Sequence, residues 1–158
     1  MIKAIIFDFS RTLLFPVDEN YKGGLNDLYK SVKDKEDFKF TNYFYLNNSV
    51  LEIAKNLKNN FNLYIFTTET VQDDPQIKSE IEEIFIKVFS AKSIGYSKKD
   101  IRSYKFIINE LSLKSGEIVF IDDSTENLLV AEKAGITTIK YEGFDKFLQK
   151  LHELGVKI

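Results

Sequence analysis

Short apolar runs that end in a polar residue constrain the fold of this chain more than any other feature. The clearest runs are residues 4–7 before Asp8, residues 63–66 before Thr67 and residues 118–121 before Asp122. Because these runs lack polar alternation, they are typical of strands that are covered on both faces in a parallel sheet. Residues 84–89 and 136–139 show the same pattern more weakly.

Helical periodicity fills the intervals between these runs. Ser49 and Glu52 have the spacing of a capping box, which predicts a helix over residues 49–59. Further helices are expected at residues 101–111, 128–134 and 144–154. Gly135 is placed to supply a left-handed C-terminal cap. Alternating strands and helices predict an α/β fold, a doubly wound, Rossmann-like parallel sheet with helices on both faces.

Residues 15–45 interrupt this alternation. They contain the Gly23-Gly24 pair, a cluster of mixed charge at residues 33–37 and an aromatic-rich segment from Phe38 to Tyr45. A chain of 158 residues with 44% hydrophobic content can bury one substantial core but is too short for two ordinary domains. We therefore expect a single domain over residues 1–158, with a small cap insertion at residues 15–45 that contains one short helix near residues 25–32.

The composition excludes several kinds of site. The chain has no cysteine, so disulfides, thiolate zinc sites and a catalytic thiol are excluded, and we expect any metal to be bound by oxygen atoms. A net charge of -2 creates no field that would concentrate nucleic acid or an anionic membrane. No stretch approaches the roughly 20 apolar residues that span a bilayer, and the N-terminus lacks a signal peptide. We therefore expect a soluble, cytoplasmic protein.

Residues that follow the apolar runs are candidates for a site, because ligands bind outside the carboxyl ends of strands in such sheets. Asp8-Phe9-Ser10-Arg11-Thr12 follows the first run and resembles the first motif of the haloacid dehalogenase-like (HAD) superfamily, in which phosphatases usually have Asp-x-Asp-x-Thr. The resemblance implies that Asp8 is a nucleophile whose direction is fixed by the sheet. The alternative is an aspartate that merely ends a strand.

Two further segments resemble motifs of the same family. Thr67 and Thr68 follow the second run and match the motif whose hydroxyl and backbone N–H groups bind the phosphoryl group. Lys98 matches the lysine that pairs with the nucleophile and the phosphate, where a cation is needed because two anions must approach each other. Lys99 occupies the position of the usual proline, which leaves open which lysine points into the site. The alternative for an isolated lysine pair is an exposed basic turn.

The fourth segment is the most specific. Residues 119–127 read Val-Phe-Ile-Asp-Asp-Ser-Thr-Glu-Asn and, with the helix and glycine that follow, resemble the acidic metal motif of the family. Asp123 matches the principal magnesium ligand and Asp122 the supporting acid. Two adjacent carboxylates at the end of an apolar strand are unfavourable unless a cation neutralises them. The alternative is that one of them simply caps the following helix.

Together these segments imply a Mg²⁺-dependent hydrolase, acting as a phosphatase through an aspartyl-phosphate intermediate on a phosphorylated substrate of unknown identity. The resemblance assigns the ion to Asp8, the backbone carbonyl of Ser10 and Asp123, with Asp122 in support. Asp8 would attack phosphorus, and Thr67 and Lys98 would hold the transferred group.

Ser10 departs from the family pattern. Most family phosphatases have a second aspartate at this position, which protonates the leaving group and activates water, an effect worth about 10²–10⁴-fold. A serine hydroxyl cannot do this near neutral pH. Three interpretations stay open: a slow phosphatase for good leaving groups, another branch of the superfamily, or a non-catalytic binding or regulatory protein. The Asp122-Asp123 pair argues against the metal-independent dehalogenase branch. The phosphonate-cleaving branch also lacks the second aspartate but depends on a lysine from its cap, and nothing singles out one of the lysines in the insertion for that role.

Overall fold

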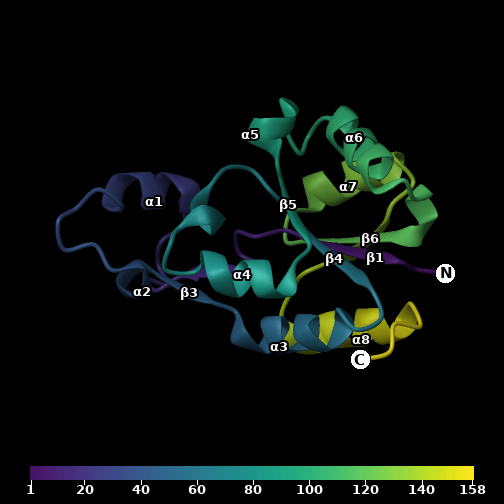
Figure 1. The fold of residues 1–158 in the computed structure, drawn as a ribbon, viewed down its shortest axis with the longest axis horizontal. Coiled ribbons are helices and arrows are strands. Elements are labelled where there is room, and N and C mark those ends of the chain that lie inside the picture. The colour runs from purple at the N-terminus through teal and green to yellow at the C-terminus, as the bar shows by residue number, and fades with distance from the viewer.

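A five-stranded, fully parallel sheet forms the centre of the computed structural model, which describes residues 1–158. The strands lie in the order β5 (Lys87–Ser90), β4 (Asn62–Thr67), β1 (Ala4–Phe7), β6 (Ile118–Asp122) and β7 (Thr137–Lys140). Helices lie on both sides of this sheet (Figure 1). The predicted fold class, a Rossmann-like α/β sheet, is therefore confirmed.

Each face of the sheet has its own apolar core. One face is covered by α3 (Asn48–Leu57), α4 (Lys78–Ile84) and α8 (Phe144–Glu153), and the other by α5 (Ala91–Ile94), α6 (Ile101–Leu111) and α7 (Thr125–Lys133). Successive side chains of β1 alternate between the two cores, with Ile5 and Phe7 in the first and Ala4 and Ile6 in the second. None of the helices is both long and apolar enough to cross a membrane.

The register of the central strand brings three strand ends together. Phe7 of β1 lies opposite Ile65 of β4 on one side and opposite Ile121 of β6 on the other. The residues that follow these strands therefore meet at one edge of the sheet. Because the strands are parallel, this is the carboxyl edge, where ligands bind in folds of this kind.

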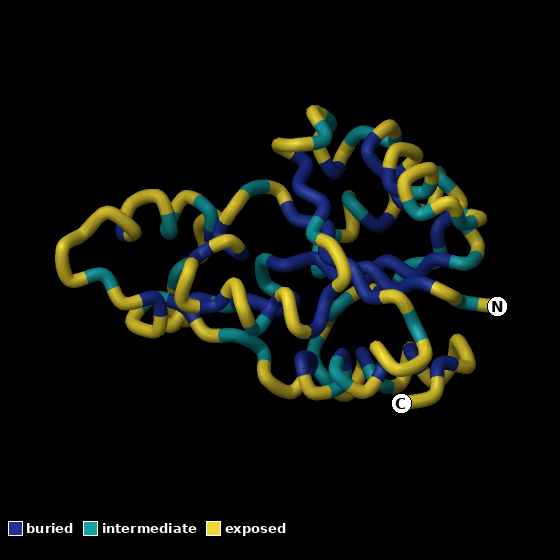
Figure 2. The backbone as a smooth tube through the Cα atoms, in the orientation of Figure 1, coloured by how far each residue is buried: buried dark blue, intermediate teal, exposed yellow.

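The insertion forms a small unit beside this edge. Its base is a separate antiparallel pair, β2 (Leu14–Pro16) with β3 (Phe44–Leu46), and its helices are α1 (Leu25–Val32) and α2 (Phe40–Tyr43). The short helix expected near residues 25–32 thus corresponds to α1. Figure 2 shows that the outer loop of the insertion is largely exposed, whereas buried segments lie where it joins the rest of the chain.

Three polar contacts fix the insertion to the loop around the 3-10 helix η1 (Val71–Asp73), which follows β4. The Tyr29 hydroxyl donates to the buried Asp74 carboxylate at 2.9 Å, and Lys30 forms a 2.5 Å ion pair with Glu69. The backbone N–H of Phe40 donates to the side chain of Gln76 at 3.0 Å. Two of these contacts come from α1 and one from the start of α2, so the loop after β4 holds both helices of the insertion in place.

The helix ends agree with the sequence pattern in one case and differ in another. Gly135 follows α7 with φ of 86°, so the predicted left-handed position is confirmed. The capping box predicted from Ser49 and Glu52 is wrong, because Asn47 is the N-cap of α3 and its side chain accepts from the Val50 N–H at 3.4 Å. Asn47 lies two residues before Ser49 and binds the Val50 N–H, one of the donors that the first turn of α3 leaves without an intrahelical partner.

Only one strand boundary differs from the prediction by more than one residue. The strand expected over residues 84–89 begins only at Lys87, because Ile84 is the last residue of α4 and is buried in the core together with Ile81. An apolar run that joins a helix end to a strand start cannot be divided by periodicity alone. β6, in contrast, follows the short 3-10 helix η2 (Ser115–Glu117) and begins where the apolar run begins.

Candidate active site

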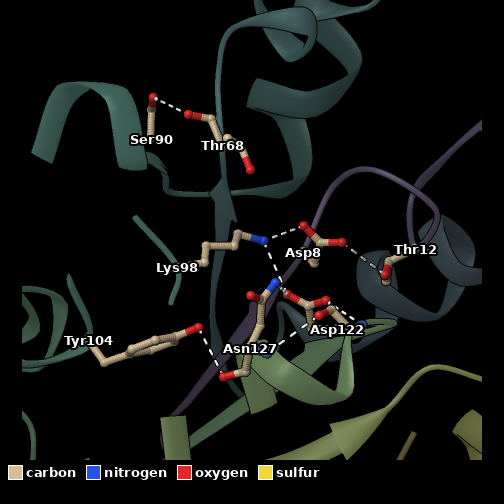
Figure 3. A network of polar contacts seen from close by, with 9 residues as sticks. Asp8, Thr12, Thr68, Ser90, Lys98, Tyr104, Asp122 and Asn127 are labelled. Atoms are coloured by element: carbon tan, nitrogen blue, oxygen red, sulfur yellow. Dashed lines mark hydrogen bonds and ion pairs between the residues drawn. The ribbon is translucent and has the colours of Figure 1, made fainter. Parts of the chain in front are cut away.

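Asp8 is held rigidly at the carboxyl end of β1. Its side chain is almost completely buried, and its backbone N–H donates to the carbonyl of Ile121 at 2.7 Å. The hydroxyl of Thr12, which is fully buried, lies 3.4 Å from Asp8 Oδ2 (Figure 3). A tight turn, in which the Leu13 N–H donates to the carbonyl of Phe9 at 2.9 Å, brings Thr12 back to the aspartate. Asp8 therefore has a fixed direction, as a reacting group requires.

Lys98 is the cation of the site. It lies between α5 and α6, and its buried ammonium contacts Asp8 Oδ1 and lies 3.2 Å from Asp122 Oδ2 (Figure 3). The ammonium also lies 5.2 Å and 5.5 Å from the ring centres of Phe66 and Phe120, which favours a cation at this position. Lys98 thus points into the site.

Lys99, the neighbouring lysine, points away from the site. Its ammonium forms a 2.8 Å ion pair with Glu126, and both side chains are largely exposed. The turn that contains both lysines ends at Asp100, whose carboxylate caps α6 by accepting from the Arg102 N–H at 2.9 Å. The departure from the usual proline at position 99 therefore does not displace Lys98 from the site.

Asp122 is oriented by the start of α7. It is fully buried, its Oδ1 accepts from the Ser124 N–H at 2.8 Å, and its Oδ2 accepts from the Asn127 side chain at 3.1 Å. The carbonyl of Asn127 in turn accepts from the Tyr104 hydroxyl at 3.1 Å. Ser124, rather than either aspartate, is the N-cap of α7. The capping interpretation of the acidic pair is therefore wrong.

Three carboxylates converge at this edge of the sheet. Oxygen atoms of Asp8, Asp122 and Asp123 lie within 4.8 Å of one another. Clustered carboxylate oxygens are the ligands that hard divalent cations prefer, and one lysine cannot offset three negative charges. The donor set therefore fits a cation such as Mg²⁺, with the ligand atoms supplied by the ends of β1 and β6.

Burial and like charges shift the acidity of these groups. Burial raises the pKa of Asp8 to about 7, a change that Lys98 opposes and Asp122 reinforces. Burial and the adjacent Asp122 also raise the pKa of Asp123. For Lys98, burial lowers the pKa, but the carboxylates of Asp8 and Asp122 outweigh it and the net change is upward. The site thus carries an excess of buried negative charge that a bound cation would relieve.

A cavity of about 330 Å³ opens over this cluster. Its lining is strongly polar and consists of Asp8, Ser10, Arg11, Gly24, Leu25, Asn26, Asp27, Thr68, Glu69, Lys98, Asp122, Asp123 and Asn127. Ser10 and Thr68 therefore share the cavity with the acidic cluster. Thr67 is buried at the end of β4 and is not part of this lining, so of the two threonines Thr68 is the one placed to contact a ligand.

Several lining residues were not expected from the sequence. Asn127 carried a local signal, since it lies one helical turn after Asp123, and Arg11 lies within the first motif. Asn26 and Asp27 carried none, because they belong to the insertion and reach the cavity only through the placement of α1. Residues contributed by an insertion can be assigned to a site only from the tertiary structure.

A Rossmann-like sheet whose carboxyl edge combines a buried lysine, three carboxylates and a polar cavity defines an α/β protein suited to hold a cation and an anion together. Residues 15–141 match the family of haloacid dehalogenase-like hydrolases, and the chain belongs to this family. The match begins after the first motif, so Asp8 and Ser10 lie outside it.

Comparison with known proteins gives relatives at low identity. Bifunctional epoxide hydrolase 2 from Rattus norvegicus is 28% identical in an alignment of 116 residues that covers 69% of this chain and 21% of the rat protein. The chain thus spans about a fifth or less of the length of the curated relatives it matches.

Two solved structures share the fold over most of the chain. A predicted HAD-like family hydrolase from Porphyromonas gingivalis superposes with a TM-score of 0.71 at 16% identity, covering 100% of both chains. A HAD family enzyme from Bacteroides thetaiotaomicron, in complex with magnesium and inorganic phosphate, has a TM-score of 0.66 at 16% identity, covering 90% of this chain and 95% of that one. At these identities the likeness shows the fold alone.

Proposed function

We propose that this protein is a Mg²⁺-dependent phosphatase that acts through an aspartyl-phosphate on Asp8. The observation that carries the proposal is the buried contact between Lys98 and Asp8 beneath a polar cavity that Asp123 also lines. A nucleophilic carboxylate can approach a phosphate dianion only when cations offset the repulsion. The magnesium and phosphate bound by the related Bacteroides enzyme support this choice of ligands.

Asp8, Asp123 and the backbone carbonyl of Ser10 would hold the magnesium ion, with Asp122 in support. When bound, the ion would polarise the phosphoryl group and offset the carboxylate charge. Lys98 and Thr68 would hold phosphoryl oxygens, because both line the cavity together with Asp8. Thr12 and the β1 backbone would keep Asp8 aligned throughout.

The reaction would occur in two displacements at phosphorus. A carboxylate oxygen of Asp8 forms a bond to phosphorus as the bond to the leaving-group oxygen breaks. Water then attacks phosphorus, the bond to Asp8 breaks, and inorganic phosphate leaves with the carboxylate restored. Because Ser10 is not an acid at neutral pH, the leaving-group oxygen takes its proton from water, so turnover depends strongly on the quality of the leaving group.

Ser10 is also the observation that favours a second candidate, a non-catalytic HAD-fold protein that binds a phosphorylated partner. The two candidates differ in turnover, whereas both retain binding. The complete set of Asp8, Lys98, Asp122 and Asp123 favours the enzyme, since a binding protein has no need of a nucleophile.

Release of phosphate from para-nitrophenyl phosphate, with and without Mg²⁺, tests the proposal. We expect Mg²⁺-dependent turnover that Asp8→Asn abolishes and that Asp145→Asn, at an exposed aspartate of α8, leaves unchanged. The good leaving group makes the assay independent of the missing acid. Wild-type protein that binds phosphate and Mg²⁺ without any turnover would instead establish the non-catalytic protein.

A further inference from the structure

Arg11 adopts a backbone conformation that is costly for its side chain. Its φ is 62°, in the left-handed region that glycine occupies freely. Ser112, at the end of α6, is the other non-glycine residue with positive φ. Such conformations cost of order 1 kcal/mol and persist where the surrounding structure requires them. The arginine side chain is thus held at a position where glycine would be less strained.

The guanidinium of Arg11 is anchored by the insertion through neutral groups. Its Nη2 donates to the carbonyl of Tyr21 at 3.1 Å and to the carbonyl of Gly23 at 2.8 Å. No carboxylate lies within ion-pair distance of it. The only other arginine of the chain, Arg102, is neutralised by Asp100 at 2.6 Å. Arg11 is therefore oriented without being neutralised.

The other charged groups of the cavity wall are already accounted for. Lys98 is paired with Asp8 and Asp122, and Glu69 is paired with Lys30 at 2.5 Å. The Asp27 carboxylate points back towards Gly24 at the start of its own helix. A Cβ atom built on Gly24 would lie only 2.9 Å from Asp27 Oδ2.

The Asp27 carboxylate lies near Gly24, where the N-terminus of α1 stabilises its negative charge. Away from the carboxylate cluster, Arg11 is thus the one cation that lines the cavity without a counter-charge.

From this geometry we infer that Arg11 is a specificity-determining residue that binds a second anionic group, carried by the leaving-group part of the phosphorylated substrate. The inference rests on the proposed function. Lys98 contacts Asp8 and Asp122 at the strand ends and Thr68 directly follows β4, so the transferred phosphate would be bound on the sheet side of the cavity. Arg11 is tied to Gly23 on the insertion side, so the remainder of the substrate faces it.

The chemistry of the guanidinium fits this role. Two of its five N–H donors are used by the two carbonyls, which leaves the donors on Nε and Nη1 for a ligand. Each of these remaining donors can give a charge-assisted hydrogen bond to a carboxylate or a phosphate, and anchoring the guanidinium in advance reduces the entropy lost on binding. Substrates with both a phosphate ester and a second carboxylate or phosphate are therefore preferred over esters of neutral alcohols.

Calorimetric binding of two phosphonates in the presence of Mg²⁺ tests the inference without requiring turnover. 3-Phosphonopropionate carries the second anionic group and propylphosphonate lacks it. For the wild type we expect roughly tenfold tighter binding of 3-phosphonopropionate, the size of one charge-assisted hydrogen-bonded contact. In Arg11→Gln, which keeps a side-chain amide to donate to the carbonyls, the ratio of the two dissociation constants should fall to about one.

The controls separate charge from structure. Arg11→Lys keeps the charge but loses the anchored guanidinium donors, so an intermediate ratio is expected, and Arg102→Gln should keep the wild-type ratio. Arg11→Gly suits the φ of 62° and gives the same readout if the glutamine variant does not fold. An equal affinity of the wild type for both phosphonates, or a preference that survives Arg11→Gln, would overturn the inference. A preference without any ester turnover would support Arg11 and refute the phosphatase.

Discussion

The ammonium nitrogen of Lys98 lies 3.2 Å from Asp122 Oδ2, across 24 residues of sequence, while it also contacts Asp8. Neither of these buried carboxylates has a second cationic side chain beside it. Breaking a buried ion pair by removing one partner leaves the other charge desolvated and unpaired. The lysine is therefore expected to matter for stability as well as for catalysis.

Lys98→Met tests this dual role. Without metal, we expect the free energy of unfolding to fall by about 3 kcal/mol, because two buried carboxylates lose their only cation. Turnover of an aryl phosphate should fall by about 10²-fold or more, as a charge that stabilises the transition state is lost. Urea denaturation and phosphate release measure the two effects. Lys99→Met, at an exposed lysine, is the matched control and should change neither quantity, and equal effects of both variants would contradict the assignment.

Mg²⁺ should stabilise the folded protein, because a ligand that binds only the native state adds to its stability. At a Mg²⁺ concentration 100 times the dissociation constant, the gain is about 2.7 kcal/mol. Asp123→Asn should remove most of this gain, since it removes a carboxylate from the cluster. Glu126→Gln, which changes an exposed acid in the first turn of α7, the helix that follows Asp123, should retain it. Thermal unfolding with and without Mg²⁺ makes the comparison, and an unchanged melting temperature in the wild type would argue against a metal site.

Ser10→Asp should restore the missing acid and base. We expect a gain of roughly 10²-fold on alkyl phosphates, which need a proton on the leaving group, and a smaller gain on para-nitrophenyl phosphate. Ser10→Asn has the same shape without the acid and should give no gain. Steady-state rates of phosphate release from both substrate types, measured for the two variants and the wild type, test this prediction. A similar change in the aspartate and asparagine variants would show that position 10 acts through packing.

Tyr29 should make the stability of the insertion depend on pH in the alkaline range. Burial raises its pKa from 10 to about 12, with the hydrogen bond to Asp74 adding to the effect. The folded state thus keeps the proton more tightly, so this contribution is fully present below pH 10 and is lost as the pH rises towards 12.

At pH 7 we expect Tyr29→Phe to lower the free energy of unfolding by about 1 kcal/mol, because it removes one hydrogen bond. The difference from the wild type should shrink between pH 10 and pH 12 in urea denaturation. Tyr45→Phe, at a half-exposed tyrosine of the same insertion, is the control. A difference that stays constant across this range would contradict the role given to Tyr29.

The elements of the sheet could be predicted because their signal is local. Residues 4–7 and 118–121 are apolar without interruption, and β1 and β6 occupy these positions with at most one added residue. The run at residues 84–89 failed because the end of α4 and the start of β5 are both apolar. The pair β2–β3 gave no signal, since each strand has three residues and pairs across the whole insertion.

The candidate site, too, could be predicted from the sequence only in part. The positions of Asp8 and Asp122 at strand ends follow from the apolar runs, because parallel strands bring their carboxyl ends together. The choice between Lys98 and Lys99 could not be made from the sequence. The two side chains are chemically identical, and they differ only in the direction in which the turn points them. Contacts between the insertion and the first motif bring three further residues into the cavity lining: Arg11, Asn26 and Asp27.

A parallel α/β sheet with acidic residues at its carboxyl edge could be predicted from the sequence alone, because hydrophobic periodicity and strand ends are properties of short stretches of chain. The lysine that neutralises Asp8, the threonine that reaches the cavity and the arginine that has no counter-ion became known from the folded structure. Those outcomes depend on side-chain direction and on contacts between residues far apart in the chain. Neither is encoded in any one segment.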